Sequence, residues 1–183
     1  MTLELWLLLI ITLLAGAMSP GPSVALVMRT AIVHGRRSGV LVALAHGVGI
    51  TVYALAVVLG LATAIQSSSS LNIGLRIGGA LFLFYLGYRM LSSGIKTVKE
   101  GDGVVTEAPR ERDHQSQTQW QHMVNGFLIV FLNPKVVLFF VAIFSQFLTP
   151  DQSITTQLMA ASMAGGIDAA WYALVAFCVS NQR

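Results

Sequence analysis

The chain has 183 residues, the length of one ordinary domain, but 55% of them are hydrophobic and only 10% are charged, and the mean hydropathy is +0.71. Because a soluble domain carries about 25% charged residues, this composition excludes disorder and most soluble folds and indicates an integral membrane protein. The formal net charge of +3 is not gathered on one basic face, which excludes a nucleic-acid-binding protein, and the single cysteine, Cys178, excludes a disulfide framework and a cysteine-rich metal or redox centre.

Five apolar runs predict five transmembrane helices. A helix needs about 20 apolar residues to cross the hydrocarbon core of a bilayer. The runs cover residues 5–28, 39–65, 73–91, 124–148 and 157–179, and the third is the weakest because arginines lie near both of its ends. We therefore expect an all-α integral membrane protein that needs neither a cofactor nor a metal.

The basic residues of the predicted loops indicate the orientation. All of them fall on one side of the membrane: Arg29, Arg36, Arg37, Lys96, Lys99, Arg110, Arg112 and Arg183. By the positive-inside rule that side is cytoplasmic, so the N-terminus is expected outside. The polar segment 92–122 is expected to be a flexible cytoplasmic loop.

Two proline motifs interrupt the apolar runs. The first run contains Ser19-Pro20-Gly21-Pro22, here called the SPGP motif, and the fourth contains Asn133-Pro134-Lys135, the NPK motif. The two runs are three spans apart and cross in opposite directions, as an inverted repeat of three helices requires. Residues 1–91 are expected to form the first repeat and residues 123–183 the second, whose third helix, the sixth of the protein, is missing.

The prolines have two interpretations. A proline removes a backbone hydrogen bond and clashes with the preceding turn, and in lipid the freed backbone groups need partners. Both motifs could therefore make discontinuous helices whose N-terminal N–H groups face a polar cavity and suit a carboxylate. Alternatively, each proline only kinks its helix. By residue count, the SPGP motif lies nearer the cytoplasmic side than the bilayer centre.

Two charges lie deep in the apolar runs. Lys135 and Asp168 each cost about 2.5–3.5 kcal/mol at the centre of a bilayer, and counting along the runs puts both near mid-depth. They could face each other. Alternatively, Lys135 could bind the carboxylate of a substrate while Asp168 binds its amine or carries a coupling proton. An ion pair that only orients two helices is the structural alternative.

Four further residues are candidates for the site. His46 is expected to be an interhelical hydrogen-bonding residue, with a proton carrier as the alternative. Trp171 and Tyr172 follow Asp168 and either shape a pocket or simply pack as aromatic side chains. Arg76 is a candidate too, although its long side chain can reach the headgroups.

Small residues recur every fourth position in two of the predicted helices. They are Gly39, Ala43 and Gly47 in one, and Ala161, Gly165, Ala169 and Ala173 in the other. Small residues at this spacing let helices approach closely, so we expect these stripes to be packing surfaces.

In this order, the motifs resemble the LysE/RhtB family of amino-acid exporters. The matching segments are Ser19 to Pro22, Gly35 to Gly39, Ala45 to Gly47, Arg76 to Gly87, Gly126-Phe127, Asn133 to Lys135 and Asp168 to Tyr172. The resemblance implies export of amino acids or close derivatives across the bacterial inner membrane, driven by the proton gradient. Family members look like six-helix proteins, so the last helix is expected to be absent here.

The sequence thus predicts an alternating-access exporter. The broken ends at Pro22 and Pro134 would receive a carboxylate, Asp168 an ammonium group or a proton, and Lys135 would balance charge. The expected partners are an amino acid, the lipid bilayer and a second copy of the chain. One alternative is a truncated scaffold that needs a partner for its missing helix. A membrane enzyme is disfavoured because the four histidines and one cysteine are dispersed.

Overall fold

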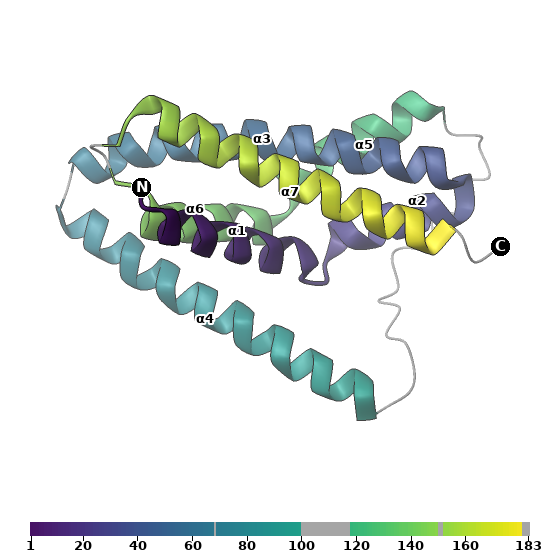
Figure 1. The fold of residues 1–183 in the computed structure, drawn as a ribbon, viewed down its shortest axis with the longest axis horizontal. Coiled ribbons are helices and arrows are strands. Elements are labelled where there is room, and N and C mark those ends of the chain that lie inside the picture. The colour runs from purple at the N-terminus through teal and green to yellow at the C-terminus, as the bar shows by residue number, and fades with distance from the viewer. Residues whose placement is uncertain (68, 100–117, 150–151, 181–183) are drawn as a thin grey trace.

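The computed structural model describes residues 1–67, 69–99, 118–149 and 152–180, and within these ranges the regular structure is entirely α-helical (Figure 1). The predicted all-α class is therefore confirmed. The helices are α1 (Leu3–Met18), α2 (Pro22–His34), α3 (Arg36–Ser67), α4 (Ser69–Lys99), α5 (Gln119–Leu132), α6 (Pro134–Phe147) and α7 (Ile154–Ser180).

Two to four of these units can cross a membrane, judged by length and composition. The stretch Arg36–Gly60 of α3 and the whole of α7 are each long and apolar enough alone. The pairs α1 with α2 and α5 with α6 meet the same criterion when each is taken as one broken span. Among the described residues of α4, the stretch Ile73–Tyr85 is apolar but shorter than a full span. The count of five spans and the outward N-terminus therefore stay predictions.

The predicted cytoplasmic loop, residues 92–122, has different limits in the structure. Helix α4 continues to Lys99, and α5 already begins at Gln119. The central part of the predicted loop, residues 100–117, lies outside the described residues.

Both proline motifs interrupt their helices. The two halves of each pair meet at an angle of 61°. Pro22 and Pro134 are the first residues of α2 and α6, where a proline is tolerated because this position needs no N–H donor. The residues before them, Gly21 and Asn133, have extended backbones, which is the conformation that a following proline favours.

The two breaks lie at a similar depth in the bundle. Helices α1 and α6 contain 16 and 14 residues, so at about 1.5 Å per residue they are about 24 Å and 21 Å long. They lie beside each other and run in opposite directions, so α1 begins and α6 ends at the same end of the molecule (Figure 1). Each break therefore faces the other near the middle of the structure, and the SPGP motif is not displaced toward one end.

The centre of the bundle is a close crossing of α3 and α7 on the predicted small-residue stripes. A methyl group added to Gly47 would lie 2.5 Å from Cβ of Ala169. One added to Gly165 would overlap the Thr51 hydroxyl and the Gly47 carbonyl, which are themselves hydrogen-bonded at 3.0 Å. The packing role predicted for these stripes is confirmed.

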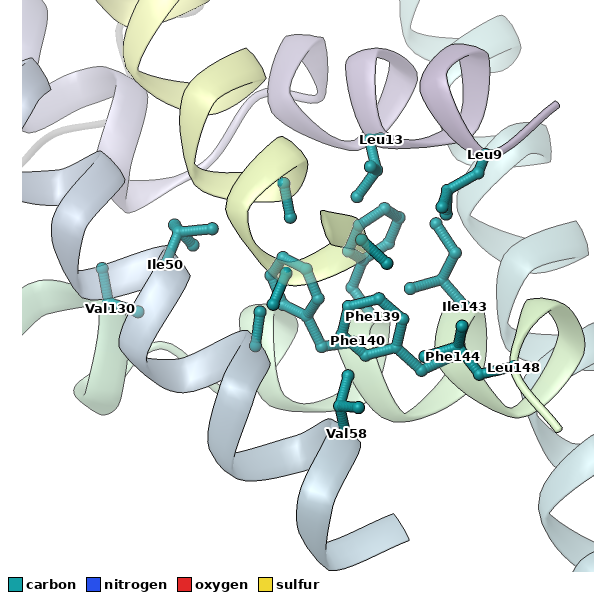
Figure 2. Packing of buried hydrophobic residues seen from close by; sticks show 14 residues of the cluster. Leu9, Leu13, Ile50, Val58, Val130, Phe139, Phe140, Ile143, Phe144 and Leu148 are labelled. Atoms are coloured by element: carbon teal, nitrogen blue, oxygen red, sulfur yellow. The ribbon is translucent and has the colours of Figure 1, made fainter. Parts of the chain in front are cut away.

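The largest apolar cluster lies in the half of the bundle that contains α1 and α6. Figure 2 shows α6 directing Phe139, Phe140, Ile143 and Phe144 into the space between α1, α3 and α7. Because lipid is as apolar as these side chains, the stability of this cluster comes from close packing rather than from transfer out of water.

At the opposite end of the bundle, Arg36 at the start of α3 contacts the end of α7. Its Nε donates to the Ser180 hydroxyl at 3.1 Å, and its guanidinium lies 4.0 Å from the centroid of the Phe177 ring. The start of α3 and the end of α7 therefore lie at one end of the bundle (Figure 1).

Replacing Gly165 by alanine should destabilise the α3–α7 crossing, because the added methyl meets the backbone of Gly47. We expect a loss of about 1–3 kcal/mol, as for other overpacked sites, measured as a lower temperature of aggregation in detergent. The matched control is Gly166→Ala, whose methyl would meet no atom within 4 Å. Equal thermal stability of the two variants would contradict the close crossing.

Candidate functional site

A cavity of about 40 Å³ lies where the two breaks meet α3 and α7. Since a site for one water needs about 10–15 Å³, it has room for about three waters. Most of its lining residues are apolar, and the polar ones come from both motifs, α2, α3 and α7. The lining residues are Leu13, Gly16, Ala17, Ser19, Gly21, Ser23, His46, Ile50, Asn133, Lys135, Val136, Phe139, Phe140, Ala164, Asp168 and Tyr172.

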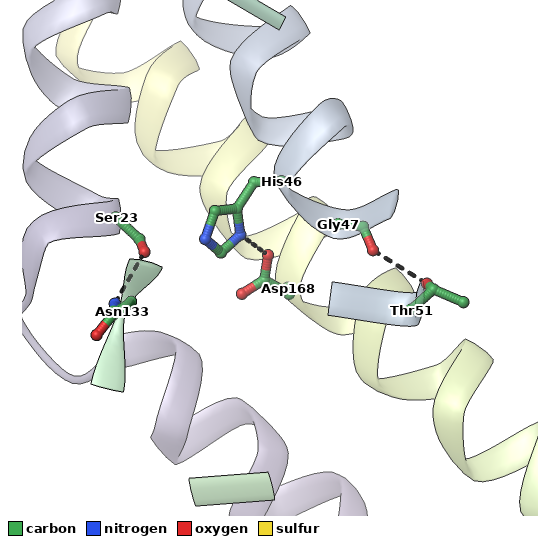
Figure 3. Close-up of polar contacts among 6 residues, drawn as sticks. All are labelled: Ser23, His46, Gly47, Thr51, Asn133 and Asp168. Carbon is green, nitrogen blue, oxygen red and sulfur yellow. Dashed lines mark hydrogen bonds and ion pairs between the residues drawn. The ribbon is translucent and has the colours of Figure 1, made fainter. Parts of the chain in front are cut away.

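An acid–base pair joins α3 to α7 beside this cavity. His46 Nδ1 lies 2.6 Å from Asp168 Oδ2, and the two residues are only 1% and 7% exposed (Figure 3). The interhelical hydrogen bond expected of His46 is therefore present. The other ring nitrogen, Nε2, is buried without a hydrogen-bond partner among the described residues, and it points toward the side on which Ser23 and Asn133 lie.

Lys135 reaches across from one break to the other. It is the second residue of α6, and its Nζ donates to the carbonyl oxygens of Ser19 at 3.0 Å and Pro20 at 3.5 Å. Asp168 has His46 as a partner, so the buried carboxylate of Asp168 and the half-buried ammonium of Lys135 line the same cavity.

Asn133 forms a second link between the breaks. Its side-chain oxygen accepts a hydrogen bond from the Lys135 backbone at 3.1 Å and so caps α6. Its amide nitrogen donates to the Ser23 hydroxyl at 3.3 Å (Figure 3). Ser23, which is buried, is a cavity-lining residue that the sequence analysis missed. Its signal is a polar side chain directly after the SPGP motif in an otherwise apolar run.

The two new helix N-termini differ in how they are capped. The start of α6 is capped by Asn133, whereas Gly21 at the start of α2 has no side chain to offer. The first N–H groups of a helix have no intrahelical partner and carry partial positive charge. Of the two ends, α2 is therefore the one that can receive an anion without displacing a side chain.

The structure places some of the sequence-predicted site residues outside the cavity lining. Trp171 is half-buried and packs against the apolar cluster around Val27 and Ala31. Arg76 lies exposed on α4, where its carbonyl accepts a hydrogen bond from Gln146 at 2.6 Å. Pro22 and Pro134 are exposed and act on the backbone. The other predicted residues line the cavity, apart from Pro20, which contributes its carbonyl to Lys135.

The model of the LysE type translocator family matches residues 14–183. The threonine efflux protein of Escherichia coli strain K12 is 28% identical to this chain over 174 residues, which make up 95% of the chain and 81% of that protein. The leucine efflux protein of Klebsiella pneumoniae is 30% identical over 142 residues, or 75% of the chain and 62% of that protein. No solved structure matches the chain.

The two roles of Asn133 can be separated by mutation. Asn133→Ala removes both the cap of α6, worth about 1 kcal/mol, and the bond to Ser23, whereas Ser23→Ala leaves the cap in place. We therefore expect Asn133→Ala to lower the thermal stability of the detergent-solubilised protein more than Ser23→Ala does. A larger loss for Ser23→Ala would show that the cap is not what stabilises this break.

Proposed function

Because the chain belongs to the LysE type translocator family, we propose that it exports an amino acid or a close derivative across the bacterial inner membrane in exchange for protons. The matched relatives named for efflux of threonine and of leucine support this cargo class. A family of translocators is a family of transporters, so the membrane-enzyme alternative is set aside, and the non-transporting scaffold is not favoured.

One observation carries the proposal: a buried acid–base pair, a lysine ammonium and an uncapped helix start all border a single cavity. Charged side chains at mid-membrane are costly and mark pathways for ions or substrates. An amino acid is a zwitterion, so it needs partners of both signs close together. The cavity offers both signs on four different helical segments.

The coupling proton is assigned to Asp168 together with His46. A carboxylate and an imidazole 2.6 Å apart can hold a proton from the outer side while the cargo leaves, and can release it to the cytoplasm before new cargo binds. Because the pair links α3 to α7, a change in its charge acts directly on the crossing at the centre of the bundle. This is the kind of local change that alternating access requires.

The cargo side chain is expected to be neutral. The apolar wall of the cavity includes Leu13, Ile50, Phe139 and Phe140. Among the described lining residues, Asp168 is the only carboxylate, and it is paired with His46. A cationic side chain would therefore find no acidic partner of its own. Since the cavity has room for only a few waters, binding of the cargo requires the half-helices to move apart.

The inverted repeat and the outward N-terminus belong to the same proposal. In it, α1 and α6 form the outer halves of the two broken spans, and α2 and α5 form the inner halves. Support comes from the opposed directions of α1 and α6 and from the shared depth of the breaks. The repeats would be residues 1–91 and 123–183.

Proton coupling is tested with everted membrane vesicles acidified inside by respiration. Asp168→Asn mimics the protonated acid, so we expect proton-driven accumulation of labelled threonine or leucine to fall to the level of vesicles without the protein, while exchange of labelled for unlabelled cargo continues. The matched control is Glu4→Gln, which neutralises an exposed carboxylate at the start of α1. Unchanged accumulation with Asp168→Asn would remove this residue from the mechanism.

Cargo selectivity is read in the same vesicles by competition. Because the apolar wall faces the cargo side chain, unlabelled neutral amino acids should inhibit uptake of the labelled one, whereas lysine and glutamate should not. Strong inhibition by lysine would contradict a neutral cargo.

A further inference from the structure

The SPGP break exposes two helix ends of opposite polarity within a few residues. Helix α1 ends at Met18. The Ser19 N–H donates to the Ala15 and Gly16 carbonyls, and the carbonyl groups that follow have no partner in α1 and carry partial negative charge. Helix α2 begins at Pro22 with no side-chain cap, so its first N–H groups carry partial positive charge. Between them lies Gly21, which lines the cavity and puts no side chain between the two ends.

A cation already occupies the negative side of this break. The Lys135 ammonium donates to the carbonyl oxygens of Ser19 and Pro20, and a methyl group placed on Gly21 would be only 3.6 Å from it. The position of this lysine is not explained by its own helix. As the second residue of α6 it lies at the positive end of that helix, where a cation is disfavoured. Its contact with the end of α1 compensates for that location.

The group that Lys135 presents is the same group that the cargo presents. A lysine side chain ends in a primary ammonium with three N–H donors, and so does the α-amino group of an amino acid. The α-carboxylate of an amino acid is attached to the same carbon as its ammonium. An ammonium on the Ser19 and Pro20 carbonyls therefore brings that carboxylate toward the first turn of α2.

We propose that the SPGP break is the subsite for the backbone of the zwitterion, and that Lys135 takes the place of the cargo's ammonium when the carrier is empty. The carbonyl oxygens of Ser19 and Pro20 accept from the cargo ammonium, and the start of α2 receives the cargo carboxylate. This subsite rests on the proposed function and deepens it, because it leaves Asp168 and His46 for the proton.

The exchange of one ammonium for another has a kinetic consequence. In lipid, backbone carbonyls without partners are costly, so an empty carrier without Lys135 cannot close and return. Net transport needs that return step. Exchange of labelled for unlabelled cargo does not, because the carrier is loaded in both directions. Lys135 is therefore required for net transport and dispensable for exchange.

The experiment compares the two transport modes in vesicles for the wild type and Lys135→Met, which keeps a long apolar side chain but has no donor. Net accumulation should fall to background, exchange should continue within about twofold of the wild-type rate, and the half-saturating concentration for exchange should fall because no ammonium competes with the cargo. Loss of exchange together with net transport, or a raised half-saturating concentration, would overturn the subsite.

Chemical rescue distinguishes the ammonium from the shape of the side chain. In a Cys178→Ser background, which removes the native thiol, Lys135→Cys should lack net transport. Reaction with a methanethiosulfonate reagent that adds an ethylammonium group should restore it, whereas the methyl reagent should not. Equal results with both reagents would overturn the proposal. If the wild type exchanges no labelled amino acid at all, the proposed function fails and the subsite falls with it.

Discussion

Backbone groups freed inside a membrane must find partners within the protein, and this constraint explains how the two broken spans are joined. The carbonyls beyond α1 are satisfied by Lys135, which belongs to α6. The start of α6 is satisfied by Asn133, which also bonds Ser23 of α2. The SPGP break is thus stabilised by Lys135 from the opposite break, and the NPK break is capped by its own Asn133, which also links it to α2. Only the start of α2 is left without a side-chain cap, and that end borders the cavity.

The acid–base pair depends on a second constraint, the close approach of α3 and α7. His46 precedes Gly47 in the sequence, and Asp168 lies between Gly165 and Ala169, so the residues that allow the helices to touch are the neighbours of the residues that pair. Without a Cβ at Gly47 and Gly165 the backbones come close enough for a 2.6 Å contact between two short side chains. Larger residues at these positions would separate the pair as well as loosen the bundle.

Much of the fold could be predicted because its causes are local in sequence. Prolines determine where helices begin, and small residues at fourfold spacing determine where helices cross. The partners of the charged side chains are not local: His46 and Asp168 are 122 residues apart, and Lys135 and Ser19 are 116 apart. Trp171 shows the same limit within one helix. Three residues after Asp168, it faces the cluster around Val27 rather than the cavity, because the rotation of α7 is fixed only by its neighbours.

The proposed cycle gives a reason why both charged side chains at the cavity have partners. Lys135 binds backbone carbonyls, and Asp168 binds His46. In the proposed cycle, the cargo and the proton therefore each displace a partner that is already bound. The free energy of binding is then only the difference between two similar interactions, and the affinity stays modest. For an exporter this is an advantage, since the cargo is bound where it is abundant and must be released outside rather than held. A site that bound the zwitterion tightly would hold it after the carrier had opened outward.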